Sequence, residues 1–254
     1  MTELVHYSVD RAVATLVLDS PENRNALSAQ LVGEVSAHLH SAASDADVRA
    51  VVLGHTGTTF CAGADLKESA AEGGPAAGTT RMLDLLRAIV ALPKPVIARV
   101  DGNVRAGGLG VVGACDIAVA GPSSTFAFTE VRLGLAPAII SVTTLGRMTQ
   151  RLAARYYLTG ETFDAAAAQA CGLITCAVAD TGVEIEAIAN SLRLCSPQGL
   201  AETKPLTTRS TLAAFDERAG QLKEQSARLF GSDEAREGML AFLERRPPAW
   251  ARQS

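Results

Sequence analysis

The sequence predicts an α/β fold that ends in a helical region. Short apolar runs rich in β-branched residues, such as Val48–Leu53 and Pro95–Val100, are typical of buried strands. Segments with apolar residues at helical spacing alternate with these runs, and beyond Ser196-Pro197 only helices are expected. We therefore predict a first region at residues 1–195, which carries the strands, and a helical C-terminal region at residues 196–254.

The elements follow in order. Leu4–Val9 and Val13–Leu18 are predicted to pair as a hairpin, and Ser28 is a candidate N-cap of a helix that ends near Ser41. The strand at Val48–Leu53 leads into a loop at Gly54–Gly63. The elements expected further along are a loop at Ala70–Thr80, helices at Arg81–Leu92, Ile140–Met148, Arg151–Leu158 and Asp164–Cys171, strands at Ile117–Ala120 and Thr125–Phe128, and C-terminal helices at Pro197–Ala214, Asp216–Phe230 and Asp233–Arg245.

Composition excludes several classes of protein. The formal net charge is −4 and no basic stripe stands out, which argues against a general nucleic-acid binder. The five cysteines form no C-x-x-C pair, so reduced thiols and a cytoplasmic location are expected. No signal peptide and no membrane-spanning apolar run are recognised. The four histidines (His6, His38, His40 and His55) show no metal-binding spacing, so we expect no metal site.

The glycine-rich stretch Asp101–Asp116 is the main candidate for a functional site. Ala106, Gly107 and Gly108 follow a predicted strand and open a predicted helix, where unpaired backbone N–H groups favour a phosphate or a developing oxyanion. The stretch also contains a G-x-G-x-x-G at Gly108–Gly113, so a nicotinamide dinucleotide site is the rival hypothesis. The fingerprint lies too far after the strand for that fold, which makes the rival the weaker interpretation.

Several stretches together resemble a known family. In chain order they are Asn25-Ala26-Leu27, F-C-A-G-A-D-L-K at 60–67, P-K-P-V-I-A at 93–98, Asp101-Gly102 with Ala106-Gly107-Gly108, C-D-I-A at 115–118 and F-A-F-T-E-V-R-L-G-L-A-P at 126–137. They are similar to the crotonase superfamily, the enoyl-CoA hydratase/isomerase group. The run Thr129–Leu135 looks more like the methylglutaconyl-CoA hydratases than the straight-chain enzymes. The resemblance implies ββα turns wound as a spiral, a helical C-terminal part used in trimer formation, and acyl-CoA thioester substrates without a separate cofactor. A homotrimer or dimer of trimers is therefore expected.

The chemistry of a thioester indicates what the site needs. Reaction at its α or β carbon places negative charge on the carbonyl oxygen, and fixed backbone N–H donors stabilise that charge. The resemblance implies that these donors are the N–H groups of Ala64 and Gly107. Glu130 is the candidate acid/base, because a carboxyl in its apolar segment is expected to have a raised pKa. The alternative is a surface glutamate paired with Arg132.

One position departs from the family. Typical hydratases carry a second glutamate where this chain has Gly110. We expect a hydratase that acts on a 2-enoyl-CoA; the alternatives are a 3-enoyl to 2-enoyl-CoA isomerase with one glutamate, and a non-catalytic acyl-CoA binder. The missing side chain is also expected to leave volume for a branched or carboxylated acyl group.

Further substrate-binding residues are predicted by position. Arg24 and Lys67 are candidates for the CoA phosphates, unless they are only exposed turn and helix residues. Asp65 either contacts the substrate or caps a short helix, and Arg105 is placed to pair with an acyl carboxylate. The remaining candidates are Ala62, Gly108 and Gly110 beside the acyl group, and Phe230 and Arg246 beside the adenine of a neighbouring subunit's CoA.

Overall fold

A computed structural model describes residues 2–65, 68 and 76–251. The strands are β1 (Val5–Asp10), β2 (Val13–Leu18), β3 (Ala50–His55), β4 (Thr59–Cys61), β5 (Val96–Val100), β6 (Asn103–Arg105), β7 (Ile117–Ala120), β8 (Thr125–Ala127), β9 (Phe163–Asp164) and β10 (Cys176–Ala177). The helices are α1 (Ala29–Ser44), α3 (Ala76–Ala91), α4 (Gly107–Ala114), α5 (Ser141–Thr144), α6 (Gln150–Thr159), α7 (Ala165–Cys171), α8 (Thr181–Arg193), α9 (Pro197–Phe230) and α10 (Asp233–Leu243), with 3₁₀ turns η1 (Pro21–Asn23), η2 (Thr129–Leu133) and η3 (Ala249–Ala251).

The N-terminal hairpin and the first helix form as the sequence predicts. Alternate residues of β2 point to opposite faces of the sheet, and Ala14, Leu16 and Leu18 are buried against the core. The Ser28 side chain accepts a hydrogen bond from Leu31 N and so caps α1. Asp164 caps α7 in the same way through Ala167 N, as predicted.

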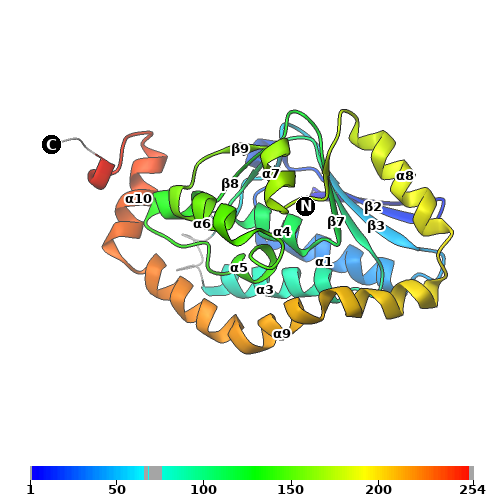
Figure 1. Cartoon of the computed structure of the whole chain (residues 1–254). Helices are drawn as coiled ribbons and strands as arrows, with labels where there is room; N and C mark the ends of the chain where they lie inside the picture. The colour runs from blue at the N-terminus through cyan, green and yellow to red at the C-terminus, as the bar shows by residue number, and fades with distance from the viewer. Residues whose placement is uncertain (1, 66–67, 69–75, 252–254) are drawn as a thin grey trace.

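The strands form two sheets that the chain visits in turn. The larger sheet has the order β1-β2-β3-β5-β7-β10, and the smaller has the order β4-β6-β8-β9. β3, β5 and β7 enter the large sheet, and the strand after each, β4, β6 or β8, enters the small one. Helices separate these strand pairs, so the chain winds as the expected ββα spiral (Figure 1). The fold is therefore α/β with a helical C-terminal region.

The short strands β4 and β6 were not predicted. The expected loop at Gly54–Gly63 contains β4, and the expected turn after β5 leads into β6. Each has three residues, too few for an alternating pattern to be visible in the sequence. β6 pairs with β4 on one side and with β8 on the other, and it leads directly to the start of α4.

The C-terminal region differs from the prediction in one respect. Pro197–Ala214 and Asp216–Phe230 are not two helices but one 34-residue helix, α9. Asp216 does not begin a helix; its carboxylate pairs with Arg87 of α3 at 2.6 Å. Figure 1 shows α9 running along α3, with α10 turning back toward the core at its far end. Phe215 and Leu222 of α9 are buried in the main core.

Two other predicted boundaries are wrong. α5 covers only Ser141–Thr144 of the helix expected at Ile140–Met148. α3 begins at Ala76, inside the loop expected at Ala70–Thr80, and the first part of that loop lies outside the described residues. In the described part of the chain, no helix is long and apolar enough to cross a membrane.

Candidate active site

A cavity of about 410 Å³ lies where β4, α3, α4 and η2 meet, partly covered by the C-terminal helices. Most of its wall is apolar, and the predicted residues Ala64, Gly107 and Glu130 all line it. Ala62, Arg24, Asp65 and Phe230 line it too. Further wall residues that sequence reasoning did not identify are Leu27, Val32, Glu68, Arg81, Met82, Leu133, Ile139, Ile140, Ser226, Phe242 and Leu243.

Two backbone segments approach each other closely at this cavity. Gly63 has a φ of +94°, and a Cβ there would stand 2.9 Å from Ala106 Cβ and 3.3 Å from Gly107 N. Only glycine satisfies both constraints. Because Ala64 follows Gly63, this approach brings the segment that carries the Ala64 N–H beside the start of α4.

The N–H groups of Ala64 and Gly107 are free hydrogen-bond donors within the described part of the chain. Among the described residues, neither donates a hydrogen bond, whereas the neighbouring Ala62 N–H donates to Arg24 O at 3.1 Å. Gly107 is the first residue of α4, where helix N–H groups have no intrahelical acceptor. Ala106 precedes it with φ +45° and ψ −118°, a conformation that is strained for a residue with a side chain. The fold thus holds two unpaired donors on the wall of one cavity.

Glu130 is held at the cavity by a short 3₁₀ turn. Its carbonyl accepts hydrogen bonds from the N–H groups of Gly134 and Leu135. α10 packs tightly against this turn, because a Cβ on Gly238 would lie 2.5 Å from Leu133 O. A Cβ on Gly134 would likewise lie 2.6 Å from the backbone of Glu234. The C-terminal helix therefore fixes the backbone that carries Glu130.

The Glu130 carboxyl is buried, and one of its two oxygens lacks a partner among the described residues. The residue as a whole is half-buried, but its Oε2 is fully buried and has no hydrogen-bond partner among the described residues. Burial raises the pKa of Glu130 to about 7, opposed only by a hydrogen bond from its own backbone N–H. It is not the surface glutamate of the alternative interpretation, and no ion pair joins it to Arg132 in the described part of the structure. A carboxyl with this pKa can take up and release a proton near neutral pH.

The other carboxylates on the wall are engaged. Glu68 Oε2 accepts a hydrogen bond from Ala29 N at 2.7 Å and lies 3.8 Å from the guanidinium of Arg81. Asp65 accepts hydrogen bonds from the Asn23 amide and from Glu68 N. The short helix that it was expected to cap falls mostly outside the described residues. Glu68 lies three residues after Asp65, and this spacing is the sequence signal that would have identified it.

Gly108 and Gly110 do not line the cavity. Both are buried inside α4, where a Cβ on Gly108 would lie 2.8 Å from Cys61 O. A Cβ on Gly110 would lie 2.5 Å from Ile140 Cγ2. The prediction of empty volume beside Gly110 is therefore wrong, because the side chains of Ile140 and Met82 fill that space. Gly113 packs against Thr143 in the same way, so the G-x-G-x-x-G serves helix packing and the dinucleotide interpretation is wrong.

The predicted cations differ in availability. Arg24 is exposed at the cavity, and its guanidinium has no partner among the described residues. Lys67 lies outside the described residues. Arg105 lines the cavity, but both of its terminal nitrogens donate at 2.7 to 3.2 Å to acceptors on its own strand β6 and on Thr125 of β8. That bonding leaves it poorly placed for an acyl carboxylate.

The two candidates in the C-terminal region, Phe230 and Arg246, differ in whether they line the cavity. Phe230 lines the cavity of its own chain, rather than only that of a neighbouring subunit. Arg246 does not line the cavity; it pairs with Glu237 at 2.7 Å and with Glu244 at 2.6 Å. No cluster of metal-ligating side chains is present in the described part of the chain.

The fold and this cavity define an α/β enzyme of the crotonase type. The family described as "Enoyl-CoA hydratase/isomerase" matches residues 8–253, and the chain belongs to this family. The structure of an enoyl-CoA hydratase from Mycobacterium avium is 55% identical, with a TM-score of 0.94 over 99% of this chain and 100% of that one. A Rhodobacter capsulatus protein named "Probable enoyl-CoA hydratase" is 34% identical, over 96% of both chains. The 2,3-dehydroadipyl-CoA hydratase of Escherichia coli is 30% identical, over 98% of both. These relatives support a hydratase-type activity on acyl-CoA.

Proposed function

We propose that this enzyme adds water to a 2-enoyl-CoA thioester and that Glu130 is its proton-transferring group. The observation that carries the proposal is the buried Glu130 carboxyl, whose Oε2 has no partner among the described residues, in the same apolar cavity as two unpaired backbone N–H groups. The thioester oxygen accepts hydrogen bonds from Ala64 N and Gly107 N. The loss of one such donor typically costs about 3–4 kcal/mol of transition-state stabilisation.

Hydration proceeds with one carboxyl in two stages. The Glu130 carboxylate takes a proton from water as the water oxygen bonds to the β carbon. The electron pair of the double bond moves to the thioester, forming an enolate whose oxygen lies at the two N–H donors. Glu130 then returns the proton to the α carbon, and a 3-hydroxyacyl-CoA results. A pKa of about 7 makes both forms of Glu130 accessible at neutral pH.

Isomerisation of a 3-enoyl-CoA is the second candidate, and one observation favours it. α4 supplies no second carboxyl, because position 110 is glycine and Ile140 fills the adjacent space. Glu130 removes a proton from the α carbon, a dienolate forms, and the same carboxyl delivers the proton to the γ carbon. The double bond, which first joined the β and γ carbons, thereby comes to join the α and β carbons. This reaction needs one base and no water.

The deciding experiment offers the purified enzyme matched 2-enoyl and 3-enoyl thioesters and follows the absorbance of the conjugated double bond. Loss of conjugation, with one water added by mass, identifies a hydratase. A gain of conjugation from the 3-enoyl substrate identifies an isomerase. The panel includes 3-methylglutaconyl-CoA, because residues 129–135 resemble those hydratases, and 2,3-dehydroadipyl-CoA, the substrate in the name of the Escherichia coli relative. If the enzyme converts no member of the panel, the proposal is contradicted.

Binding and assembly follow the family pattern in this proposal. Arg24, which lines the cavity, is the described candidate for binding the CoA phosphates, and Lys67, which lies outside the described residues, is the second candidate. Leu240, Phe242 and Leu243 on α10 are 46 to 63% exposed, as expected for a contact between subunits of a homotrimer or dimer of trimers. Leu222 of α9 is buried within its own chain and so does not belong to that surface. We place the enzyme in the cytoplasm.

A further inference from the structure

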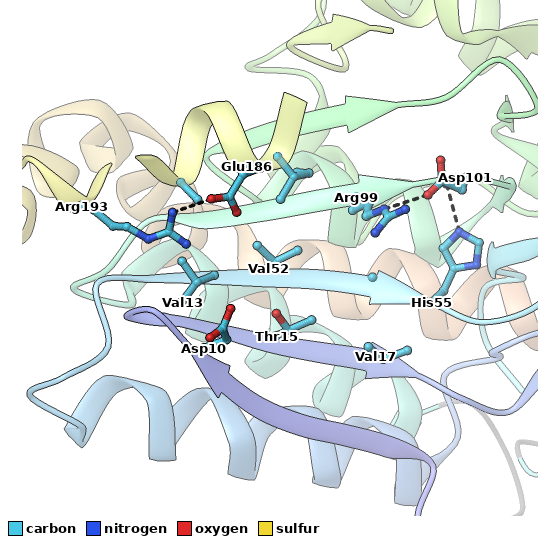
Figure 2. Close-up of a pocket in the computed structure, with 13 residues that line it drawn as sticks. Asp10, Val13, Thr15, Val17, Val52, His55, Arg99, Asp101, Glu186 and Arg193 are labelled. Carbon is cyan, nitrogen blue, oxygen red and sulfur yellow. Dashed lines mark hydrogen bonds and ion pairs between the residues drawn. The ribbon is translucent and has the colours of Figure 1, made fainter. Parts of the chain in front are cut away.

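A second cavity of about 280 Å³ lies on the opposite face of the large sheet and shares no residue with the candidate active site. Its floor is the outer face of β2 and β3, and α8 forms one wall (Figure 2). Val13, Thr15 and Val17 point outward here, whereas the alternate residues of β2 are buried in the main core. We call this cavity the outer groove.

Gly54 opens the floor of the outer groove. It pairs with Val17 in the sheet, and a Cβ built on it would meet no atom within 4 Å. Its φ is outside the left-handed region, so the backbone does not require glycine. Glycine in the interior of a strand weakens the sheet and often marks a close approach by a ligand. The missing side chain is what leaves room above this strand.

Arginine side chains in the outer groove keep unused hydrogen-bond donors. Arg99 uses its Nε for Asp101 and Thr181, and its two terminal nitrogens have no partner among the described residues. The carboxylates there already accept bonds: Asp101 from Arg99 and Thr181, and Glu186 from Arg11 and Arg193. Figure 2 shows the Arg99–Asp101 and Arg193–Glu186 contacts. Asp10, at the rim, accepts from Arg11.

His55 adds no charge that would repel or attract an anion. Its Nε2 accepts a hydrogen bond from Asp101 N at 3.0 Å, which leaves Nδ1 to donate to Thr56 O. Both ring nitrogens are thereby occupied in the neutral form, and burial lowers the pKa of His55. Arg99, together with Nη2 of Arg193, which has no partner among the described residues, therefore offers the groups that can bind an anion in the outer groove.

Apolar side chains also line the outer groove, beside Thr15. Val13 and Val52 on the floor and Ala189 on α8 belong to a small second core, with Ile185 packed against it. Val17 extends this surface toward Gly54. A ligand with an anionic head over Gly54 and a short apolar body along these side chains matches the wall at both ends.

We propose that the outer groove is a binding site for a small carboxylate with an apolar body. The carboxylate accepts hydrogen bonds from the terminal nitrogens of Arg99, and the body covers Val17, Val52 and the side of α8. Charge-assisted bonds of this kind are the strong ones in proteins. The site is independent of the proposed reaction, since none of its residues lines the active-site cavity.

The test uses hexanoate as the probe, with the active-site cavity occupied by saturating hexanoyl-CoA, a thioester without a double bond. Amide NMR resonances of Gly54 and Arg99 are expected to shift and saturate with hexanoate. Hexanamide, which has the same body and no charge, is expected to bind at least about tenfold more weakly. Gly54→Leu fills the open space and is expected to abolish binding. Gly33→Leu adds the same side chain at another open glycine, on α1, and is expected to leave binding unchanged.

Three results would overturn the proposal: shifts confined to residues around Glu130, equal binding of hexanoate and hexanamide, or undiminished binding by a folded Gly54→Leu protein. A thermal melt reports whether each variant is folded. If Gly54→Leu does not fold, Arg99→Gln replaces it, since glutamine keeps a donor but loses the charge. Binding by Arg99→Gln within about twofold of wild type would then reject the site.

Discussion

Ile140 occupies the space that a side chain at position 110 would need, with its Cγ2 2.5 Å from the place where a Cβ on Gly110 would lie. Glycine at this position and isoleucine at the other form a matched pair: the small residue on α4 accommodates the large one that precedes α5. The absence of a second carboxyl on α4 is thus built into the packing of the core.

Replacing this pair tests whether the packing excludes a second carboxyl. Gly110→Ala is expected to destabilise the protein by about 1–3 kcal/mol, because the new methyl group overlaps Ile140. Ile140→Ala should relieve most of that cost, giving a strongly non-additive double-mutant cycle in chemical denaturation. Additive effects would show that the two residues do not compete for the same space.

In Gly110→Glu/Ile140→Ala, we expect the ratio of hydration to isomerisation to rise.

Glu130→Gln is expected to lower kcat by about 10²–10⁴-fold while leaving acyl-CoA affinity nearly unchanged. Glutamine keeps the size of the side chain but cannot take up or release the proton. Steady-state kinetics and calorimetric binding of a saturated acyl-CoA measure the two quantities separately. Wild-type turnover by this variant would reject the catalytic assignment.

Activity should depend on pH through Glu130. Both candidate reactions begin with the carboxylate, so kcat/KM is expected to rise with pH up to about 7 and then to level off. A profile that is flat between pH 5 and 8 (roughly the range in which such a group titrates) would contradict this assignment.

The free energy of unfolding should also depend on pH through Glu130, but it should fall as pH rises. The pKa of Glu130 is about 7 in the folded protein and 4.5 without burial, so the folded state binds more protons between these values. Its contribution to stability is fully present below about 4.5 and is lost as pH rises toward 7, by about 3 kcal/mol. Denaturation of Glu130→Gln across this range should lack that loss. Parallel pH curves for the two proteins would exclude the raised pKa.

A buried ion pair fastens the C-terminal helix to the core. Lys204 of α9 lies 2.7 Å from Asp116 and donates to the carbonyls of Ile89 and Lys94, and its side chain is 4% exposed. Lys204→Met is expected to cost about 3–5 kcal/mol, because Asp116 is left buried without its cation. Lys223→Met on the same helix is the control and should change stability by less than about 0.5 kcal/mol. Similar losses in the two variants would exclude a specific role for the ion pair.

The sequence by itself determined much of this protein. Alternation in β2, the cap at Ser28 and the glycines before α4 are local features, because each depends on residues close together in the chain. The family motifs added Ala64, Gly107 and Glu130, which the structure brings to one cavity. Strands as short as β4 and β6, and the continuous helix across Ala214 and Asp216, carried no such local signal.

Only the tertiary structure decided what surrounds these residues. Glu130 Oε2 is buried at a cavity whose walls include residues of α3 and of the C-terminal helices, which are distant in sequence. The same holds for the open space above Gly54 and the filled space beside Gly110: both are glycines in regular elements, and nothing nearby in the chain distinguishes them. The volume beside a residue is set by whichever side chain packs there from elsewhere, and that is a property of the fold rather than of the local sequence.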